Sequence, residues 1–221
     1  MGERCDNLTS AFAGLSAGQC ALLGSGFDAA SPAWVSVYRE CSLDELAQIA
    51  REGLAPTPPE LRPAEVRREM EILDRFRPAR VIESGVSRLR AIYAAPTPED
   101  TPRLPFRRDR IILEMTIDPA GSRVGDMNFI TGLIPFLGVE RGGLERFHGA
   151  FRRYWDGILP LSVFLDSYER NGDGQAGRWT VRDNAPVGLP RDFFAPEILV
   201  MTPVIDQRHI RIVRRQPPAE A

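Results

Sequence analysis

The chain contains no lysine, and it has few histidines and cysteines. All 28 of its basic residues are arginine, only two residues are histidine, and its three cysteines, Cys5, Cys20 and Cys41, stand far apart. No cysteine pair has the spacing of a zinc or redox motif, which argues against a metal site and favours a reducing compartment. His148 and His209 alone are too few to suggest a zinc enzyme or a histidine-dependent hydrolase.

Long apolar runs are also missing. No stretch of the sequence approaches the roughly 18 apolar residues that span a membrane, and the N-terminus lacks the basic and apolar regions of a secretory signal. The net charge of -2 at pH 7 gives no broad electrostatic attraction to nucleic acid or to an anionic membrane. We therefore expect a cytoplasmic protein without a membrane partner, or one delivered to a target cell by a route that needs no signal.

The composition that remains is that of a globular protein. Hydrophobic residues make up 43% of the 221 residues and charged residues 26%, which suits one sizeable domain. Residues 1–30 are rich in glycine, alanine and serine, and are expected to form an N-terminal arm or accessory segment. We place the domain at residues 31–215 and a disordered tail at residues 216–221.

Helical patterns come early in the chain and strand patterns dominate later. Ser42 and Glu45 have the spacing of a capping box, which predicts a helix that ends near Gly53. Apolar spacing predicts a second helix after Pro63 and a third whose apolar face is Leu144, Phe147, Phe151 and Trp155. Tyr154 and Trp155 are expected in the core. Strands are predicted at residues 34–38, 90–95, 110–118, 161–168, 178–182, 197–202 and 209–213. The order predicts an α+β fold with a mostly antiparallel sheet.

Two loop signals have simple structural interpretations. Residues 169–174 partly match a calcium-binding loop, but the twelfth position is Thr180 rather than an acid, so a hairpin turn between residues 161–168 and 178–182 is the better interpretation. Asp126 is expected to cap the turn that follows it.

Three residues could carry chemistry on a nicotinamide nucleotide. Arg39 ends a predicted strand, where its guanidinium could bind a pyrophosphate through two hydrogen bonds; the alternative is an ion pair with Glu40 or Glu45. Tyr93 has small neighbours and could stack on a planar cation such as nicotinamide; the alternative is a half-buried strand tyrosine.

Glu197 is the third of these residues. Cleavage of the bond between nicotinamide and ribose builds positive charge on the sugar, and a fixed carboxylate stabilises that charge. A carboxylate can also orient an attacking nucleophile. Glu197 precedes an apolar run and so lies at the edge of a buried element. The alternative is an ordinary polar residue at a strand edge.

The order of these segments resembles the ADP-ribosyltransferase superfamily, including its poly(ADP-ribose) polymerase branch. Residues 37–42 resemble that family's first core strand and helix, residues 92–95 resemble its tyrosine-bearing strand, and residues 196–200 resemble the strand with its catalytic glutamate. The resemblance implies an ADP-ribosyltransferase-like α+β fold in which two small, mostly antiparallel sheets form a split core with helices packed around it.

The resemblance also implies a site. Glu197 and Tyr93 would be the catalytic residues, and NAD, the substrate, would be held by Arg39, Tyr38, Ser42 and Tyr93, without a metal. Tyr93 stands where arginine-type enzymes have a serine motif, so the set is a mixed arginine–tyrosine–glutamate type. Ala195 replaces the acid that orients an arginine acceptor, and Arg39 replaces the histidine of the polymerase branch. Neither arginine modification nor chain elongation is therefore implied.

The acceptor stays open, because a protein, a nucleic acid and a small molecule all fit the resemblance. An antidote or immunity partner is expected only if the chain is a toxin or effector. Three alternatives share the scaffold: an NAD glycohydrolase, an RNA phosphotransferase-like enzyme, and a non-catalytic nucleotide-binding or interaction module. The phosphotransferase would need more basic residues and histidines than this chain has.

Overall fold

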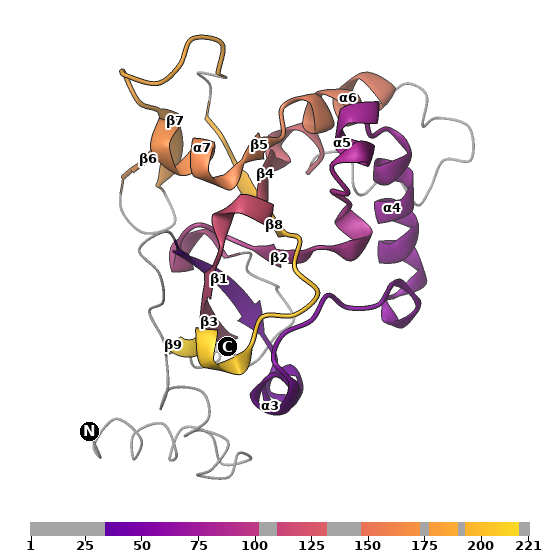
Figure 1. Cartoon of the computed structure of the whole chain (residues 1–221), viewed down its shortest axis with the longest axis vertical. Coiled ribbons are helices and arrows are strands. Elements are labelled where there is room, and N and C mark those ends of the chain that lie inside the picture. The colour runs from indigo at the N-terminus through magenta and orange to yellow at the C-terminus, as the bar shows by residue number, and fades with distance from the viewer. Residues whose placement is uncertain (1–33, 102–109, 132–146, 173–176, 190–192, 217–221) are drawn as a thin grey trace, which may run out of the picture. The chain divides into compact units, whose positions relative to one another are not determined.

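The computed structural model describes residues 34–101, 110–131, 147–172, 177–189 and 193–216 (Figure 1). The predicted arm at residues 1–30 and residues 217–221 of the predicted tail lie outside these ranges. The chain divides into two compact units, each assembled from separate stretches of sequence. Unit 1 comprises Met1–Ala55, Ala95–Asp118 and Pro203–Ala221, and unit 2 comprises Pro56–Ala94 and Pro119–Thr202.

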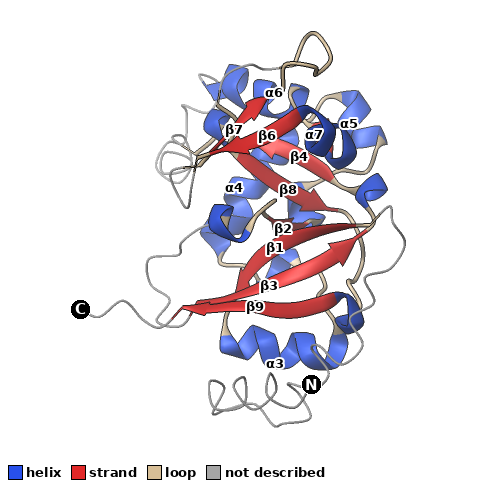
Figure 2. Cartoon of the chain, turned by 90° about the vertical axis from the view of Figure 1, so that its left-hand side faces the viewer, coloured by secondary structure: helices blue, strands red, loops and turns tan. Residues whose placement is uncertain are grey.

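Unit 1 is built on a three-stranded antiparallel sheet with the order β1-β3-β9 (Figure 2). Its strands are β1 (Val35–Cys41), β3 (Arg110–Ile117) and β9 (Ile210–Gln216). The central strand β3 is buried at every position from 111 to 117, and its β-branched and apolar residues suit such a strand. The predicted strands at residues 34–38, 110–118 and 209–213 are therefore confirmed.

Helix α3 (Leu43–Glu52) follows β1 and begins with the predicted capping box. The Ser42 hydroxyl accepts a hydrogen bond from the Glu45 amide at 3.2 Å, and the Glu45 carboxylate accepts one from the Ser42 amide at 2.9 Å. The helix ends at Gly53, whose φ of 78° favours glycine. A Cβ atom at Gly53 would also lie 2.5 Å from the carbonyl oxygen of Ile205, so this end of the helix has no room for a side chain.

The cap makes Ser42→Ala a test of local stability. Removing the hydroxyl leaves the Glu45 amide without its acceptor, and we expect the free energy of unfolding to fall by about 1 kcal/mol. Ser42→Asp is the matched control, because aspartate is an equally good capping residue and should stay close to the wild type. Urea denaturation of the three proteins measures the difference. Equal stability of the alanine and aspartate variants would contradict the role of the cap.

Unit 2 contains a four-stranded antiparallel sheet with the order β2-β8-β4-β5. Its strands are β2 (Ile92–Ala94), β8 (Pro196–Val200), β4 (Arg123–Asp126) and β5 (Leu159–Pro160). The register pairs Tyr93 with Leu199 across β2 and β8, and Gly125 with Glu197 across β4 and β8. Glu197 therefore pairs with β4, one residue before the part of β8 that pairs with β2.

Helices cover the core of unit 2. They are α4 (Ala64–Arg75), α5 (Ala79–Glu83) and α6 (His148–Asp156). The indole of Trp155 donates a hydrogen bond to the carbonyl oxygen of Leu73 at 2.7 Å and so ties α6 to α4. Tyr154 and Trp155 are fully buried, as expected. The core residues are Ile72, Leu73, Val81, Val86, Ala91, Ile130, Phe151, Tyr154, Trp155, Ile158 and Leu199.

The strand predicted at residues 161–168 is wrong. The segment forms helix α7 (Leu161–Ser167), in which Leu161, Phe164 and Ser167 are buried at the three-residue spacing of a helical face. A shorter hairpin follows, with β6 (Tyr168–Asn171) paired to β7 (Arg178–Val181).

The α+β class with antiparallel strands is confirmed. The described residues form five α-helices and three small antiparallel sheets, where the family resemblance implies two sheets. Asp126 caps the turn after β4, as predicted, by accepting a hydrogen bond from the Asn128 amide. Within the described ranges, no helix is both long and apolar enough to cross a membrane.

Candidate functional site

The five predicted site residues are distributed over the two units. Tyr38 and Arg39 lie on β1 of unit 1, and Ser42 caps α3 in the same unit. Tyr93 and Glu197 lie on neighbouring strands, β2 and β8, of unit 2. The shared NAD cleft that would join the two groups stays a prediction.

In unit 1, Arg39 forms the ion pair that the sequence offered as its alternative. Its Nη2 atom lies 3.2 Å from Oε1 of Glu45, and its side chain is 20% exposed. Its Nε atom is buried and has no hydrogen-bond partner among the described residues. The guanidinium therefore keeps donors that the ion pair does not use. The Ser42 hydroxyl serves as the helix cap.

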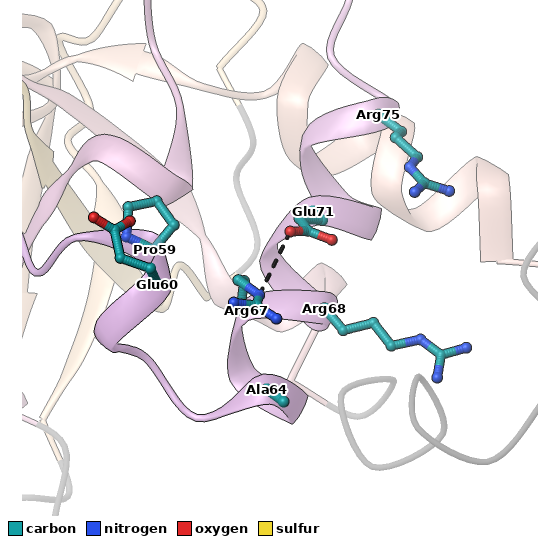
Figure 3. Close-up of a pocket in the computed structure, with 7 residues that line it drawn as sticks. All are labelled: Pro59, Glu60, Ala64, Arg67, Arg68, Glu71 and Arg75. Atoms are coloured by element: carbon teal, nitrogen blue, oxygen red, sulfur yellow. Dashed lines mark ion pairs between the residues drawn. The ribbon is translucent and has the colours of Figure 1, made fainter.

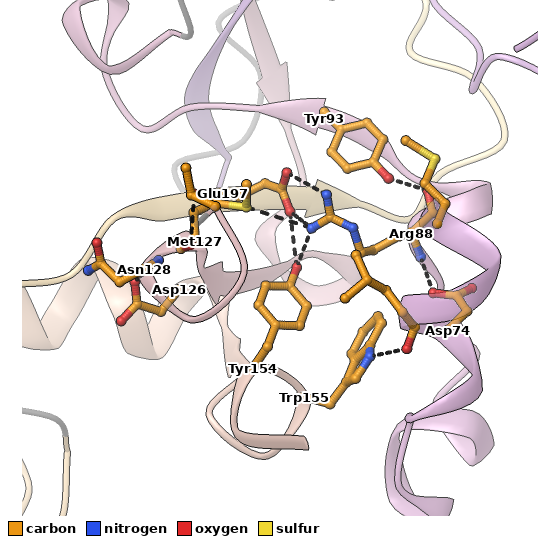
Figure 4. Close-up of polar contacts among 12 residues, drawn as sticks. Asp74, Arg88, Tyr93, Asp126, Met127, Asn128, Tyr154, Trp155 and Glu197 are labelled. Carbon is orange, nitrogen blue, oxygen red and sulfur yellow. Dashed lines mark hydrogen bonds and ion pairs between the residues drawn. The ribbon is translucent and has the colours of Figure 1, made fainter. Parts of the chain in front are cut away.

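In unit 2, Glu197 lies near the start of β8 and accepts hydrogen bonds on both carboxylate oxygens (Figure 4). The Arg88 guanidinium donates from Nη1 to Oε2 and from Nη2 to Oε1, the latter at 3.1 Å. The Tyr154 hydroxyl donates to Oε2 at 3.0 Å. The side chains of Arg88 and Glu197 are only 6% and 14% exposed. Glu197 is thus one half of a buried, bidentate ion pair.

Arg88 is held at its backbone and at its guanidinium. Its amide donates to Oδ1 of Asp74 at 3.1 Å, and its carbonyl oxygen accepts a hydrogen bond from the Tyr93 hydroxyl at 2.5 Å. Its Cζ atom lies 5.2 Å from the centre of the Tyr93 ring and 5.3 Å from that of the Tyr154 ring, both within cation–π range. Tyr93 and Glu197, two of the predicted site residues, therefore contact the same arginine.

Asp74 fixes the backbone that carries Arg88. It lies near the end of α4, where its buried carboxylate accepts hydrogen bonds from the Ser87 hydroxyl and the Arg88 amide. Arg77 adds an ion pair to the same carboxylate at 3.9 Å. Helix α4 thereby sets the position of the 3-10 helix Arg88–Arg90.

Tyr154 reaches Glu197 because Gly125 leaves space for its ring. Gly125 lies opposite Glu197 in the β4–β8 pairing, and a Cβ atom on Gly125 would lie 2.5 Å from the Tyr154 hydroxyl oxygen. Gly125→Ala should therefore displace the ring and lower the free energy of unfolding by about 1–3 kcal/mol. Gly121→Ala is the control, because nothing lies within 4 Å of the added atom. Equal losses in the two variants, measured by urea denaturation, would contradict this packing.

The charges around Glu197 perturb the protonation of its neighbours. Burial raises the pKa of the Tyr154 hydroxyl well above its usual range, against the opposing effect of the Arg88 cation. The pKa of Tyr93 is raised for the same reason. Burial disfavours the charged form of Arg88, but Glu197, Tyr154 and Tyr93 together outweigh this effect, and the pKa of Arg88 lies well above its usual value. At neutral pH both phenols are therefore hydrogen-bond donors and the guanidinium is a cation.

All four tyrosines of the chain have raised pKa values, which predicts alkaline instability. Burial is the main cause for each of them, and it raises the pKa of Tyr168 to about 12. Unfolded tyrosines lose protons from a pH of about 10, while the native ones stay neutral. The free energy of unfolding is therefore highest below about pH 10, with respect to these tyrosines. It falls as the pH rises through their native pKa values. Phenolate absorbance should rise at higher pH in the native protein than in the denatured one, and coincident titrations would contradict this.

Sequence reasoning missed Arg88 and the polar role of Tyr154. Arg88 is buried and its neighbour Arg90 is exposed, yet both lie in one short arginine-containing segment without a feature that separates them. Tyr154 is expected in the core, and nothing in the sequence near it indicates that its hydroxyl contacts Glu197. The available signal was indirect: a carboxylate at the start of an apolar strand needs a partner when it is buried.

An open hollow on the surface of α4 is a separate feature of unit 2 (Figure 3). It has a volume of about 600 Å³ and is lined by both acidic and basic residues. Two of them form an ion pair, with 3.8 Å between Nε of Arg67 and Oε1 of Glu71. The lining contains three arginines and two glutamates, a mixture that favours neither an anionic nor a cationic ligand. Its lining residues are Pro59, Glu60, Ala64, Arg67, Arg68, Glu71 and Arg75.

The chemistry open to the Glu197 site follows from its own residues. A fixed anion beside two phenols and a guanidinium can stabilise developing positive charge. Among the described residues, no group of three or more acids, histidines or cysteines is arranged to hold a metal ion. Comparisons with protein-family models, with curated proteins and with solved structures give no match for this chain.

Proposed function

We propose that the chain transfers ADP-ribose from NAD to an acceptor, with Glu197 as the catalytic carboxylate. The observation that carries this proposal is the fixed position of Glu197 near the start of β8, where Arg88 and Tyr154 hold it and Tyr93 lies against the same arginine. The small antiparallel sheets support an ADP-ribosyltransferase-like fold, in which a glutamate at the start of a strand is the catalytic residue.

The proposed reaction breaks the bond between the nicotinamide nitrogen and the ribose carbon. The electron pair leaves with nicotinamide, and the ribose passes through an oxocarbenium-like state that the Glu197 carboxylate stabilises. The acceptor's nucleophile then forms a bond to the same carbon and loses its proton. The products are nicotinamide, an ADP-ribosylated acceptor and a proton. With water as the acceptor, the same residues perform NAD hydrolysis.

Arg39, Tyr38 and Ser42 are the proposed pyrophosphate-binding residues, and Tyr93 is the proposed nicotinamide-binding residue. Arg39 would hold the pyrophosphate through the donors that Glu45 leaves free, with Tyr38 and Ser42 beside it. Stacking of nicotinamide on Tyr93 has a structural requirement, because the guanidiniums of Arg62 and Arg88 already lie over the ring at 5.7 and 5.2 Å. Nicotinamide would have to compete with these guanidiniums for the ring.

A non-catalytic nucleotide-binding module is the second candidate function. It is favoured by the contacts of Glu197 itself, because a carboxylate paired with a buried arginine can serve the fold alone. Such a module would bind NAD without releasing nicotinamide.

The two functions separate in one experiment. The purified chain is incubated with NAD that carries a label in the nicotinamide ring, and NAD binding, free nicotinamide and ADP-ribosylated products are measured together. The enzyme releases nicotinamide, and the module only binds NAD. Absence of NAD binding at millimolar concentration would contradict both functions.

A further inference from the structure

We propose that Arg88 and Tyr154 are positioning residues for Glu197, and that they leave one lone pair, on Oε1, to receive a substrate hydroxyl. This inference rests on the proposed function. Arg88 and Tyr154 act through the carboxylate and need not touch the substrate. The sequence did not single out Arg88, and it favoured a core position for Tyr154.

The Glu197 carboxylate accepts fewer hydrogen bonds than it has acceptor positions. An ionised carboxylate has about four acceptor positions, two on each oxygen. Oε2 accepts hydrogen bonds from the Arg88 guanidinium and the Tyr154 hydroxyl, and Oε1 accepts one from the guanidinium. Among the described residues these are its only donors, so Oε1 keeps one position. A substrate hydroxyl can bind there without breaking a contact that holds the carboxylate.

The two positioning residues are themselves held by packing. Asp74 and Tyr93 fix the backbone of Arg88 from both sides. The Tyr154 ring lies against Gly125 and meets the Trp155 ring edge-on, with 5.1 Å between the ring centres. The carboxylate cannot rotate without losing charge-assisted hydrogen bonds in a buried site. Such a fixed anion needs no reorganisation when positive charge develops on the ribose.

Tyr154→Phe tests the positioning role, because it removes one hydroxyl and keeps the ring. Tyr168→Phe is the matched control, because Tyr168 is equally buried but its ring contacts Phe164 and Phe194. We expect Tyr154→Phe to lower kcat for nicotinamide release by about 10- to 100-fold, since small misplacements of catalytic groups cost that much. Its KM for NAD should stay within about twofold of the wild type, because ground-state binding is kept. Tyr168→Phe should change neither constant.

Arg88 variants provide a second measurement. Lysine keeps the charge of Arg88 but cannot bind both carboxylate oxygens in a planar fork. The kcat values should therefore fall in the order wild type, Arg88→Lys, Arg88→Met, at similar KM, when each rate is divided by the folded fraction from circular dichroism. A merely structural role would lower the folded fraction and leave the kcat of the folded protein unchanged.

The outcomes separate this inference from the proposed function. Suppose that Glu197→Gln is inactive, but that Tyr154→Phe has the same kcat as Tyr168→Phe, with or without a change in KM. The positioning role is then wrong and the proposed function stands. If the wild type binds NAD but releases no nicotinamide, the proposed function is wrong and the positioning role falls with it. A selective loss of kcat in Tyr154→Phe, with Arg88→Lys between the wild type and Arg88→Met, supports both.

Discussion

Glu197→Gln is expected to lower kcat for nicotinamide release by about 10²–10³-fold, the typical cost of removing one preorganised electrostatic group from an active site. The glutamine has almost the same shape but carries no negative charge. It therefore cannot stabilise the positive charge that develops on the ribose as nicotinamide leaves. The measurement is nicotinamide release at saturating NAD, corrected for the folded fraction of each protein.

The folded fraction matters because the substitution also leaves the buried Arg88 cation without its anion. Glu83→Gln is the matched control. Glu83 is the last residue of α5 in the same unit and its side chain is exposed, so its neutralisation should leave the rate unchanged. If the two glutamine variants are equally active, Glu197 is not the catalytic carboxylate.

Arg88→Met is expected to have the largest effect on stability. It leaves the Glu197 carboxylate buried without a cation, and removing one partner of a buried ion pair typically costs about 3–5 kcal/mol. The double variant Arg88→Met/Glu197→Leu removes both charges. It should be more stable than Arg88→Met, because no buried charge is left without a partner. The buried Tyr154 hydroxyl loses its acceptor, so the double variant should stay about 1–3 kcal/mol below the wild type. Chemical denaturation of the wild type, Arg88→Met, Glu197→Leu and the double variant completes a double-mutant cycle.

An exposed ion pair of the same unit is the control for this cycle. Arg67 and Glu71 pair across one turn of α4 with side chains that are almost half exposed, so Arg67→Met should cost less than about 1 kcal/mol. A similar small loss in Arg88→Met would mean that the Arg88–Glu197 pair is solvated. A double variant no more stable than Arg88→Met would mean that the destabilisation does not come from the unpaired charge.

Sequence patterns predicted the elements whose determinants are local. The capping box of α3 lies within four residues, and strand β3 is recognisable from its own apolar composition. Residues 161–167 show the limit of this approach: a short apolar run after Pro160 suits a strand or a buried helix, and the burial of every third residue is visible only in the structure.

The candidate site was only partly predictable, because its contacts join distant parts of the chain. Glu197 lies 109 residues from Arg88 and 43 residues from Tyr154. No local pattern indicates which of the 28 arginines pairs with a given glutamate. Glu197 and Tyr93 could be proposed because each has a chemical role in a known type of site. Arg88 could not, because its place depends on how α4, the 3-10 helix Arg88–Arg90 and β8 pack.

The most direct test of the central claim is nicotinamide release by the double variant Arg88→Met/Glu197→Leu, measured alongside its stability. This variant removes the ion pair from the fold without leaving a buried charge, so it separates the catalytic role of Glu197 from its structural role. We predict a folded protein that is more stable than Arg88→Met and shows no nicotinamide release above background. Release of nicotinamide at the wild-type rate by this stable variant would contradict the proposal that Glu197 is the catalytic carboxylate.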